Sequence, residues 1–434
     1  MTTARVVLWG RTIGAVTWEE AQGIALFEYD RAFQSAGIEV SPLTMPVGPG
    51  IFRFPALSRD SFKGLPGMLA DSLPDKFGNA VIDAWLAREG RPRGAMNSVE
   101  RLCYTGSRGM GALEYQPEAG MRKEPGDKLS ISTLVDLAQE VIEEREGLHG
   151  ELNGSKEDEA ALRDILRVGT SAGGARAKAV LAWNPSTGEF RSGQVEVAEG
   201  FQHWLMKFDG VSGNKDKELA DPMGFGRLEY ACYVMAKDAG VEMSECQLYE
   251  EGGRAHFMTK RFDRTRQGQK VHMQSLCAMR HFDFNMARAY SYEQAIETGR
   301  LLKLPRKDLE QQVRRAYFNV IIRNQDDHTK NIAYLMDRSG KWTLSPAFDV
   351  VYAYNPSGSW TSQHQMSING KTKDFSDDDL IALASFADIG KSRAQKMLAE
   401  IRDVVMSWER YAERAGVPED LAKRAKNGFR LGLK

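Results

Sequence analysis

A hydrophobic helical segment that runs directly into a dense cluster of polar residues is the strongest constraint on how this chain folds. Within eight positions, the stretch IIRNQDDHTKN (residues 321–331) places Asn324, Asp326, Asp327, His328, Lys330 and Asn331. Polar and charged groups are costly to bury unless each finds a partner. The segment therefore predicts either a solvated, well-capped helix end or a site that uses these groups.

The charge balance of the whole chain excludes a polycation made for nucleic acid. The 434 residues are enough for two or three domains. A hydrophobic content of 42% and a charged content of 27% are ordinary for a soluble globular protein. Lys and Arg number 58 and Asp and Glu 59, so the charges nearly cancel, and only a local basic patch remains compatible with these totals.

Cysteine usage and the N-terminus predict a protein of a reducing compartment. Cys103, Cys232, Cys246 and Cys277 are scattered and form no CxxC pair, which argues against a disulfide framework or a Cys-based zinc site. The N-terminal MTTARVVLWG lacks the apolar core of a signal peptide, and no run approaches 18 apolar residues. We expect a cytoplasmic protein without a membrane segment.

Turn residues and hydrophobic periodicity divide the chain into three parts. Residues 1–127 are rich in short apolar strands and end in the Gly/Pro-bearing connector PEAGMRKEPGDK. Residues 128–265 begin with the predicted helix SISTLVDLAQEVIEEREG and then mix strands with helices. Helices dominate residues 266–434, where one apolar stripe over 397–411 predicts a buried helix face. The chain is therefore predicted to be α+β, with a mixed sheet-and-helix lobe followed by a helical lobe.

Two chemical interpretations of the polar cluster compete. A metal hydrolase would use Asp and His as ligands, but the histidines are scattered and no HExxH pattern accompanies the cluster. A phosphoryl-transfer site needs a carboxylate that accepts the hydroxyl proton of its substrate and, one short turn later, an Asn that holds magnesium. Asp326 and Asn331 have this D-x-x-x-x-N spacing, and Lys330 could neutralise a transferring phosphate. An isolated match of this kind also occurs in ordinary acidic loops.

Further residues occur in the order that a kinase requires. The segment IAYLMDRSGKWTLSPAFDVV predicts a strand, a turn and a strand that lead to Phe348 and Asp349, where a second metal-binding carboxylate belongs. Upstream, Lys207 on the predicted strand FQHWLMKF precedes Glu229 on the predicted helix RLEYACYVMAKDAG. A kinase pairs a strand lysine with a helix glutamate in this order. An edge-strand lysine and a surface glutamate remain the structural alternatives.

The candidate phosphate-binding turn is VGTSAGGARAK, residues 168–178. Gly169 and Gly174 lie at P-loop distance, but Ala175 and Arg176 stand where Walker A has Lys and Ser/Thr, and the GxGxxG pattern does not match either. A Gly/Ser-rich turn can still direct backbone N–H groups at phosphate. Because a strand lysine follows it, we interpret this segment as a phosphate-binding turn rather than a plain loop.

Five segments follow one another along the chain: DSLPDKFGNAVIDAWL, SAGGARAK, MTKRFDR, NQDDHTKN and SPAFDVV. Together they resemble the HipA family of bacterial serine/threonine kinases, the toxin half of a toxin–antitoxin pair. The resemblance covers nearly the whole chain and implies a protein-kinase-like two-lobe fold with an added N-terminal β-rich subdomain and a helical C-terminal lobe. It also implies ATP and magnesium as cofactors. The implied partners are a helix-turn-helix antitoxin similar to HipB and, through that complex, operator DNA.

The resemblance assigns roles residue by residue. Asp326 resembles the catalytic base, Asn331 and Asp349 the magnesium ligands, and Lys207 the nucleotide-phosphate lysine with Glu229 as its helix partner. Ser171 matches the loop serine that members of the family autophosphorylate. The ATP contacts implied in addition are Ser171 itself, Ala172, Gly173, Gly174, Lys178, Lys260, Phe262, Asp263, His328 and Lys330.

Three positions depart from the family pattern. Lys260 stands where Glu is frequent, in the segment that matches the adenine-binding strand. An adenine contact through backbone atoms would survive this change, whereas a contact through the carboxylate would not. Asp327 and Thr329 stand where the family has small residues. Whether they alter the choice of substrate is left open by the sequence.

Three functions stay open from the sequence. An active kinase would modify a protein, and the resemblance implies an aminoacyl-tRNA synthetase such as the glutamyl enzyme as a target. A kinase-fold protein could instead act chiefly as a co-repressor that binds a DNA-bound antitoxin. A small-molecule phosphotransferase would use the same residues. The presence of Asp326, Asn331, Asp349 and Lys207 favours an enzyme, because a pseudokinase has no physical need for metal ligands.

Overall fold

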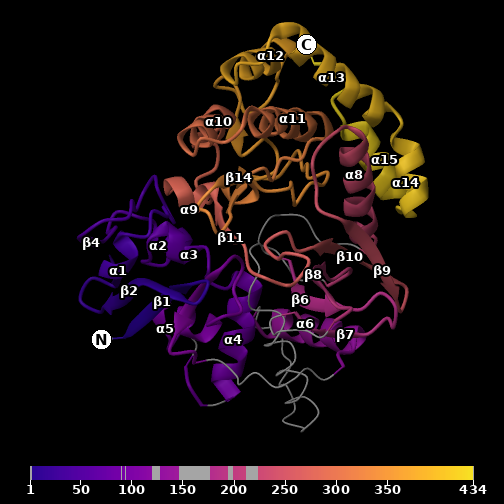
Figure 1. Ribbon diagram of the computed structural model, residues 1–434. Helices are drawn as coiled ribbons and strands as arrows, with labels where there is room; N and C mark the ends of the chain where they lie inside the picture. Colours follow the sequence, from indigo (N-terminus) through magenta and orange to yellow (C-terminus); the bar gives the residue numbers. More distant parts are fainter. Residues whose placement is uncertain are drawn as a thin grey trace.

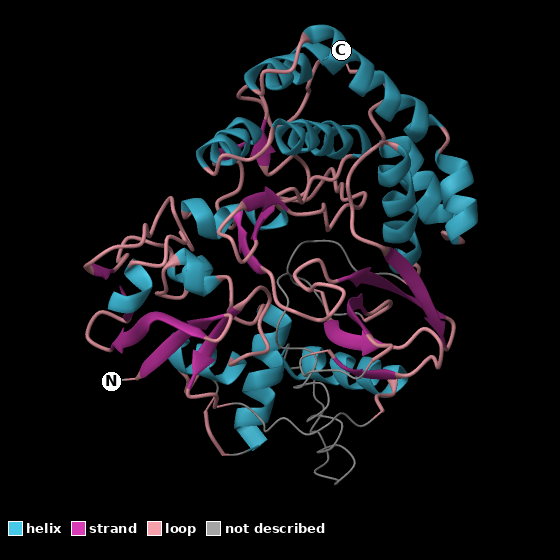
Figure 2. Ribbon diagram, viewed as in Figure 1, coloured by secondary structure: helices cyan, strands magenta, loops and turns pink. Residues whose placement is uncertain are grey.

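The computed structural model describes residues 2–88, 90–92, 94–119, 128–145, 176–193, 199–211 and 223–433. In Figure 1 an N-terminal sheet lies at the lower left, a second sheet at the lower right and a largely helical region above both. Figure 2 shows most strands in the two lower regions and most helices in the upper one. Among the helices of these ranges, none combines the length and the apolar character needed to cross a lipid bilayer.

The N-terminal region is built on an antiparallel sheet of five strands in the order β4-β3-β2-β1-β5. Buried and exposed side chains alternate along parts of these strands, so one face packs on the core. The strands are β1 (Thr3–Leu8), β2 (Arg11–Glu19), β3 (Ile24–Tyr29), β4 (Ile51–Phe52) and β5 (Leu113–Gln116). The helices are α1 (Arg31–Gln34), α2 (Arg59–Phe62), α3 (Gly67–Ala70), α4 (Lys76–Arg88) and α5 (Ser98–Thr105).

The middle region holds a second antiparallel sheet of five strands in the order β7-β6-β8-β10-β9. Apolar side chains of a long helix pack on this sheet in one core, and another helix packs on its strands β9 and β10. The strands are β6 (Lys178–Trp183), β7 (Phe190–Ser192), β8 (Gln202–Lys207), β9 (Cys246–Glu251) and β10 (Arg254–Lys260). The two helices are α6 (Ile131–Arg145) and α8 (Phe225–Asp238).

The C-terminal region is mainly helical and surrounds a three-stranded sheet, β11-β13-β14, and the parallel pair β12 and β15. Its helices are α9 (Leu276–Arg280), α10 (Tyr292–Leu301), α11 (Arg306–Ile322), the short 3-10 helix η2 (Thr329–Asn331), α12 (Asp377–Phe386), α13 (Lys391–Met406), α14 (Trp408–Ala415) and α15 (Glu419–Gly428). Its strands are β11 (His272–Ser275), β12 (Tyr290–Ser291), β13 (Ala333–Met336), β14 (Trp342–Leu344) and β15 (Met366–Ser367).

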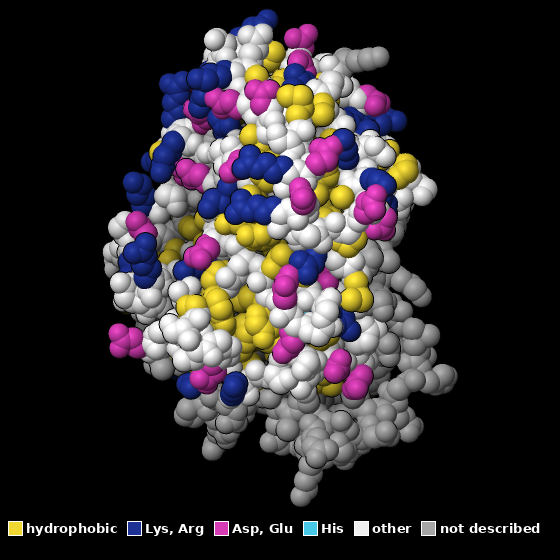
Figure 3. All heavy atoms as spheres, turned by 90° about the vertical axis from the view of Figure 1, so that its right-hand side faces the viewer, with side chains coloured by type: hydrophobic (Ala, Val, Ile, Leu, Met, Phe, Trp, Pro, Cys, Tyr) yellow, Lys and Arg dark blue, Asp and Glu magenta, His cyan; other side chains and the backbone are white. Residues whose placement is uncertain are grey.

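The apolar stripe predicted over 397–411 is buried, but it belongs to two helices. Ser407 ends α13 and precedes α14, so the stripe continues across a break in the helix. Met397, Ile401 and Trp408 are each at most 1% exposed. Around these helices, Lys and Arg side chains are interspersed with Asp and Glu on the side of the molecule shown in Figure 3.

The hydrophobic cores cross the boundaries predicted at 127/128 and 265/266. The largest core joins N-terminal strands to α8 and to the C-terminal helices, as Val6, Cys232 and Tyr317 illustrate. A second core joins Phe77 of α4 to Trp204 of β8. Each sheet lies inside one predicted range, yet the apolar packing makes the three regions depend on one another.

Helix α8 is fixed to the second sheet at its N-terminus. The buried carboxylate of Asp209 accepts hydrogen bonds from the backbone N–H groups of Gly224 and Gly226 at 3.1 and 3.2 Å, and from that of Ala255 at 3.2 Å. A carboxylate at this end also complements the helix dipole. The close approach needs a glycine, because a Cβ on Gly226 would lie 2.0 Å from the carbonyl oxygen of Ala255.

We expect Gly226→Ala to destabilise the fold by about 1–3 kcal/mol, the range found when a well-packed contact is overfilled. The added methyl group has to push α8 away from β10. Chemical denaturation would measure the loss. Gly390→Ala is the matched control, since a Cβ there meets no atom within 4 Å and the backbone φ of −63° suits alanine. Equal stability of the two variants would contradict this account of the contact.

Candidate active site

The polar cluster begins where α11 ends. Arg323 adopts the left-handed conformation with φ 53°, which terminates the helix after Ile322. The next side chain, Asn324, donates from Nδ2 to Oδ1 of Asn319 on the helix and to the backbone oxygen of Asp349, each at 3.1 Å. The turn after α11 is thereby joined to the segment that follows β14.

A buried lysine connects three elements at the centre of the molecule. Lys207 at the end of β8 donates from Nζ to Glu229 Oε1 of α8 at 2.5 Å and also to Asp349 Oδ1. The second oxygen of Glu229 pairs with Arg176 at 2.9 Å. Glu229 is 1% exposed, so its charge is held inside the protein by these two cations. The strand lysine and helix glutamate thus form the pair that the sequence predicted.

The charges in this group shift one another's protonation equilibria. Burial by itself lowers the pKa of Lys207, but the charges of Asp349 and Glu229 outweigh it and raise the pKa to about 12. Burial raises the pKa of Asp349, and the cations Lys207 and Lys178 lower it by more, so the net pKa lies well below its ordinary value. Lys207 therefore stays cationic and Asp349 anionic across the physiological pH range.

Asp349 has an uncommon backbone conformation. Its φ of 54° lies in the left-handed region, which a non-glycine residue adopts at an energetic cost of about 1–3 kcal/mol. Asn324 holds its backbone oxygen, and Lys207 holds its side chain. The preceding ring, Phe348, packs against Phe262 with 5.6 Å between the centroids. These contacts direct the Asp349 carboxylate towards Lys207.

The adjacent residues Asp326 and Asp327 face different surroundings. Asp327 is 3% exposed and accepts hydrogen bonds at 2.8 Å from Tyr292 Oη, His364 Nδ1 and the backbone N–H of Gln365. Its carboxylate is therefore a structural anchor. The side chain of Asp326 is 30% exposed, which leaves it accessible as a base.

Asn331 lies on the same short turn as Asp326. Its Nδ2 donates to the backbone oxygen of Asp326 at 2.9 Å. Because the amide nitrogen is turned towards the protein, the amide oxygen is directed elsewhere and can serve as a ligand. Carboxylate and amide oxygens are the donors that magnesium accepts in proteins. Asn331 and Asp349, which line one narrow cavity together with Asn324, therefore fit a magnesium ion.

Two further predicted residues, His328 and Lys330, lie beside this turn. His328 Nε2 is 3.8 Å from Asp326 Oδ1, and the imidazole packs against Phe284 with 5.7 Å between the ring centroids. The ammonium group of Lys330 lies over the same phenylalanine ring at 4.7 Å. Phe284 thus contacts both side chains, and the His328 imidazole lies next to the candidate base.

Lys178 has a partner that the sequence did not reveal. Its Nζ lies 3.1 Å from Oδ2 of Asp75, and both side chains are at most 3% exposed. Asp75 also accepts from the backbone N–H of Gly78 at 2.6 Å, which places the carboxylate at the start of α4. The charge of Lys330 acts on the same carboxylate. Asp75 belongs to the DSLPDKFG segment, so the motif could have indicated a site residue, although nothing local showed which partner it meets.

The segment that matches the adenine-binding strand leaves one backbone amide available. The N–H groups of Lys260 and Arg261 donate to the carbonyl oxygens of Glu245 at 2.8 Å and His203 at 2.9 Å. The N–H of Phe262 donates to no oxygen of the described residues. The Lys260 side chain pairs with Glu245 at 3.1 Å, so its ammonium is directed to the surface.

Asp263 is not brought into the group around Lys207. It is 0% exposed, and its two oxygens accept from Arg261 at 2.9 and 2.7 Å, from Arg264 at 2.9 Å and from the backbone N–H of Gly111 at 2.7 Å. Burial raises the pKa of Asp263, but the guanidinium groups of Arg261 and Arg264 lower it by more, so the net pKa lies well below its ordinary value. Asp263 ties the N-terminal region to the strand before it and has no oxygen left for ATP.

The candidate phosphate-binding residues Ser171, Ala172, Gly173 and Gly174 lie outside the described residues. Arg176, which follows them, is described, and its guanidinium lies over the Phe225 ring at 4.6 Å in addition to pairing with Glu229. The roles assigned to residues 171–174 therefore stay predictions.

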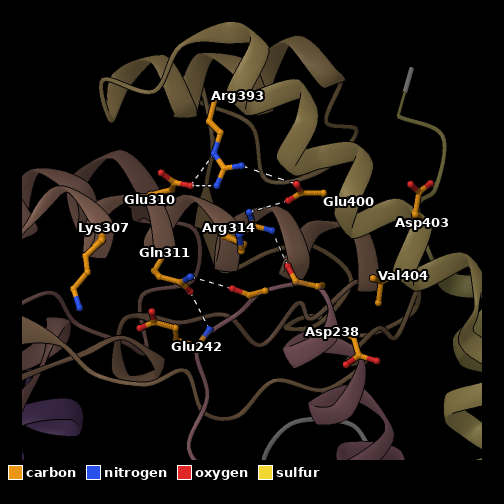
Figure 4. Close-up of a pocket in the computed structure, with 12 residues that line it drawn as sticks. Asp238, Glu242, Lys307, Glu310, Gln311, Arg314, Arg393, Glu400, Asp403 and Val404 are labelled. Carbon is orange, nitrogen blue, oxygen red and sulfur yellow. Dashed lines mark hydrogen bonds and ion pairs between the residues drawn. The ribbon is translucent and has the colours of Figure 1, made fainter.

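A surface pocket of about 540 Å³ lies where the C-terminal end of α8 meets α11 and α13 (Figure 4). Arg314 on α11 donates to the carbonyl oxygen of Ala239 at 2.8 Å, and Gln311 donates to that of Gly240 at 3.0 Å. The carbonyl oxygen of Glu242 then accepts from the N–H of Ala347 at 2.8 Å, two residues before Asp349. The segment directly after α8, the helix that carries Glu229, thus binds both α11 and the segment that carries Asp349.

A sheet whose lysine is bound to a helix carboxylate lies against a helical region that carries the candidate base Asp326 and the candidate metal ligands Asn331 and Asp349. This arrangement is that of a two-lobe kinase-like protein. Models of the HipA N-terminal domain and of the HipA-like C-terminal domain match residues 4–116 and 170–408. The chain belongs to the HipA family, which confirms the resemblance seen in its motifs.

One solved structure agrees with this fold over nearly its whole length. The HipA chain of Shewanella oneidensis MR-1, solved with HipB and its operator DNA, matches with a TM-score of 0.65 at 16% identity, over 98% of this chain and 95% of that one. The Helicobacter pylori proinflammatory kinase CtkA matches with a TM-score of 0.32 at 9% identity, over 52% of this chain and 88% of that one, a similarity too weak to define a fold. No curated protein matches the chain.

We expect Glu229→Gln to lower the free energy of unfolding by about 3–5 kcal/mol. The substitution removes the carboxylate that pairs with both Lys207 and Arg176, so two largely buried cations lose a negative charge that they share. Urea denaturation would measure this loss. Glu250→Gln is the matched control: Glu250 pairs with Arg227 at 2.6 Å but is 59% exposed, so its removal should cost less than about 1 kcal/mol. Similar losses in the two variants would show that the central ion pair is no more important than a surface pair.

Proposed function

We propose that this chain is an ATP- and magnesium-dependent serine/threonine protein kinase that acts as the toxin of a toxin–antitoxin pair. The observation that carries the proposal is the contact of Lys207 with Glu229 and Asp349, together with the cavity that Asp349 lines with Asn331, whose amide binds the backbone of Asp326. These residues come from separate elements, and a kinase needs this set. Family membership supports the same activity.

The accessible carboxylate of Asp326 has the role of general base in this proposal. It accepts the proton of the acceptor hydroxyl while the acceptor oxygen forms a bond to the γ-phosphorus and the bond between that phosphorus and the ADP oxygen breaks. Lys207, Lys178 and Lys330 supply positive charge for the phosphates. Asn331 and Asp349 would hold magnesium, which when bound neutralises phosphate charge. Glu229 holds the positive charge of Lys207 in place before ATP binds, so the site needs little reorganisation when the phosphates arrive.

Adenine would bind along the segment after β10 through backbone atoms. The N–H of Phe262 is available as a donor, as described above, and its side chain is partly exposed beside Phe348. Lys260 is directed to Glu245 at the surface, so its difference from the family's Glu does not disturb a backbone contact. Asp263 acts here by holding the segment in place.

The proposed partner is a helix-turn-helix antitoxin similar to HipB, whose complex with this chain would bind operator DNA. The solved Shewanella HipA supports this, because it was obtained together with HipB and operator DNA. The near balance of 58 basic and 59 acidic residues also fits a partner that supplies most of the phosphate contacts. The proposed location is the cytoplasm.

The proposed acceptor is a protein, and the family resemblance suggests an aminoacyl-tRNA synthetase such as the glutamyl enzyme. Incubation of the purified chain with labelled ATP, magnesium and a cell lysate would identify it by the labelled band. Label found only in small molecules would favour the small-molecule phosphotransferase, and binding of the antitoxin without any transfer would favour the co-repressor.

In the same assay, Asp326→Ala should slow phosphoryl transfer by ~10²–10⁴-fold, the usual contribution of a general base, while ATP binding is kept. Asp349→Ala should instead weaken the binding of ATP with magnesium, because a metal-binding carboxylate is lost. Calorimetry separates the two effects. Asp403→Ala, on the exposed side of α13, is the control for loss of an aspartate. Full transfer by Asp326→Ala, or unchanged ATP affinity in Asp349→Ala, would refute the corresponding role.

Self-phosphorylation at Ser171 is the proposed off-switch. A phosphoserine carries a charge of about −1.5 to −2 at neutral pH, so it would repel ATP phosphates held by the same Gly/Ser-rich segment. Protein incubated with ATP and magnesium should gain phosphate on the 168–178 peptide and then bind ATP poorly. Mass spectrometry locates the phosphate, with Thr170→Ala and Ser171→Ala distinguishing the neighbouring hydroxyls. An unmodified peptide in a preparation that phosphorylates its target would reject the switch.

A further inference from the structure

The candidate base has a side-chain partner outside the family motifs. Trp360 Nε1 donates to Oδ1 of Asp326 at 2.7 Å. An indole N–H donates only one hydrogen bond and accepts none, so this contact has a definite direction. A donor held on one oxygen restricts rotation of the carboxylate and so determines where the other oxygen points. The reach of a general base depends on that orientation.

The loop that carries Trp360 is anchored on the neighbouring carboxylate. Asp327 accepts from His364 Nδ1 and from the backbone N–H of Gln365, each at 2.8 Å. The side chain of Gln365 then donates from Nε2 to the carbonyl oxygen of Trp360 at 2.5 Å. His364 is 0% exposed, so this end of the loop is packed inside the protein. Two adjacent carboxylates therefore bind the same loop at two points.

A second segment holds the loop from its other side. Arg288 donates from Nη2 to the carbonyl oxygen of Ser359 at 2.6 Å, one residue before Trp360. The backbone N–H of Arg288 donates to the carbonyl oxygen of Gln365 at 3.1 Å. The indole is consequently supported on both sides along the chain, as a positioning group needs to be.

We infer that Trp360 is a positioning residue for phosphoryl transfer, which orients the carboxylate of Asp326, and that Asp327 acts through the loop by holding Trp360 in place. The inference rests on the proposed function for its kinetic meaning. It also accounts for the two consecutive aspartates: Asp326 meets the acceptor hydroxyl, whereas Asp327 maintains the loop that orients Asp326.

A double-mutant cycle tests this role. Trp360→Phe keeps an aromatic ring and removes the N–H, and should lower kcat for label transfer to the lysate protein by ~10–100-fold, which corresponds to one hydrogen bond to a charged acceptor. The KM for ATP should stay unchanged. In an Asp326→Ala background the same substitution should change the remaining rate by less than about twofold, because its effect passes through Asp326. An equal loss in both backgrounds would overturn the inference.

The matched control is Trp9→Phe, which removes an indole N–H bound to the carbonyl oxygen of Lys270 at 2.9 Å. Trp9 and Trp360 are both partly exposed. Trp9→Phe should leave kcat and KM as in the wild type. A similar fall in kcat for Trp9→Phe and Trp360→Phe would indicate a general loss of packing and would also overturn the inference.

A measurement without substrate tests the contact itself. The chain has eight tryptophans, so the indole N–H signals in a ¹⁵N spectrum are few enough to resolve. The signal lost in Trp360→Phe identifies Trp360, and it should move in Asp326→Ala and in Asp327→Asn, while the Trp9 signal stays in place. An unmoved Trp360 signal would refute the contact. If the signal moves but the wild type transfers no phosphate, the proposed function fails and the positioning role fails with it, whereas the contact stands.

Discussion

The arrangement around Lys207 is the interaction on which the other parts of the site depend. One ammonium group lies between the carboxylates of Glu229 and Asp349, so a strand, a helix and the segment after β14 have to meet at one point. Separating such a group would leave charges uncompensated in a largely buried place. This electrostatic requirement explains why α8 is held so firmly, by Asp209 at its start and by Arg314 beyond its end.

The polar cluster after α11 is the second half of this arrangement. Some of its side chains bind protein groups and others stay available for chemistry. Asn324 and Asp327 bind protein groups, whereas Asn331 lines one cavity with Asp349. The side chain of Asp326 is 30% exposed. Buried polar groups are usually hydrogen-bonded, and both oxygens of Asp327 and the amide nitrogen of Asn324 have partners. These hydrogen bonds partly offset the cost of ending a core helix on so many polar groups, and they also orient the candidate base and the candidate metal ligands.

Much of the site could be predicted from the sequence because its chemistry is encoded in short spacings within single elements. The D-x-x-x-x-N spacing predicts Asp326 and Asn331 as site residues, and the order of strand, helix and strand pair predicts Lys207 with Glu229 and Asp349. The structure brings Lys207 into contact with both carboxylates. The α+β architecture followed from periodicity in the same way. These signals are local, since each depends on residues that are neighbours along one helix, strand or turn.

Only the tertiary structure decided which residues meet across long distances in the chain. Asp75 reaches Lys178 and Trp360 reaches Asp326 from separate segments, and the break of the C-terminal stripe at Ser407 has no counterpart in its apolar pattern. The sequence by itself determined the kinds of groups available and their local order. It could not determine these partners. The conformation of a loop depends on how whole regions pack, and loops have no periodic pattern of apolar residues from which that conformation could be predicted.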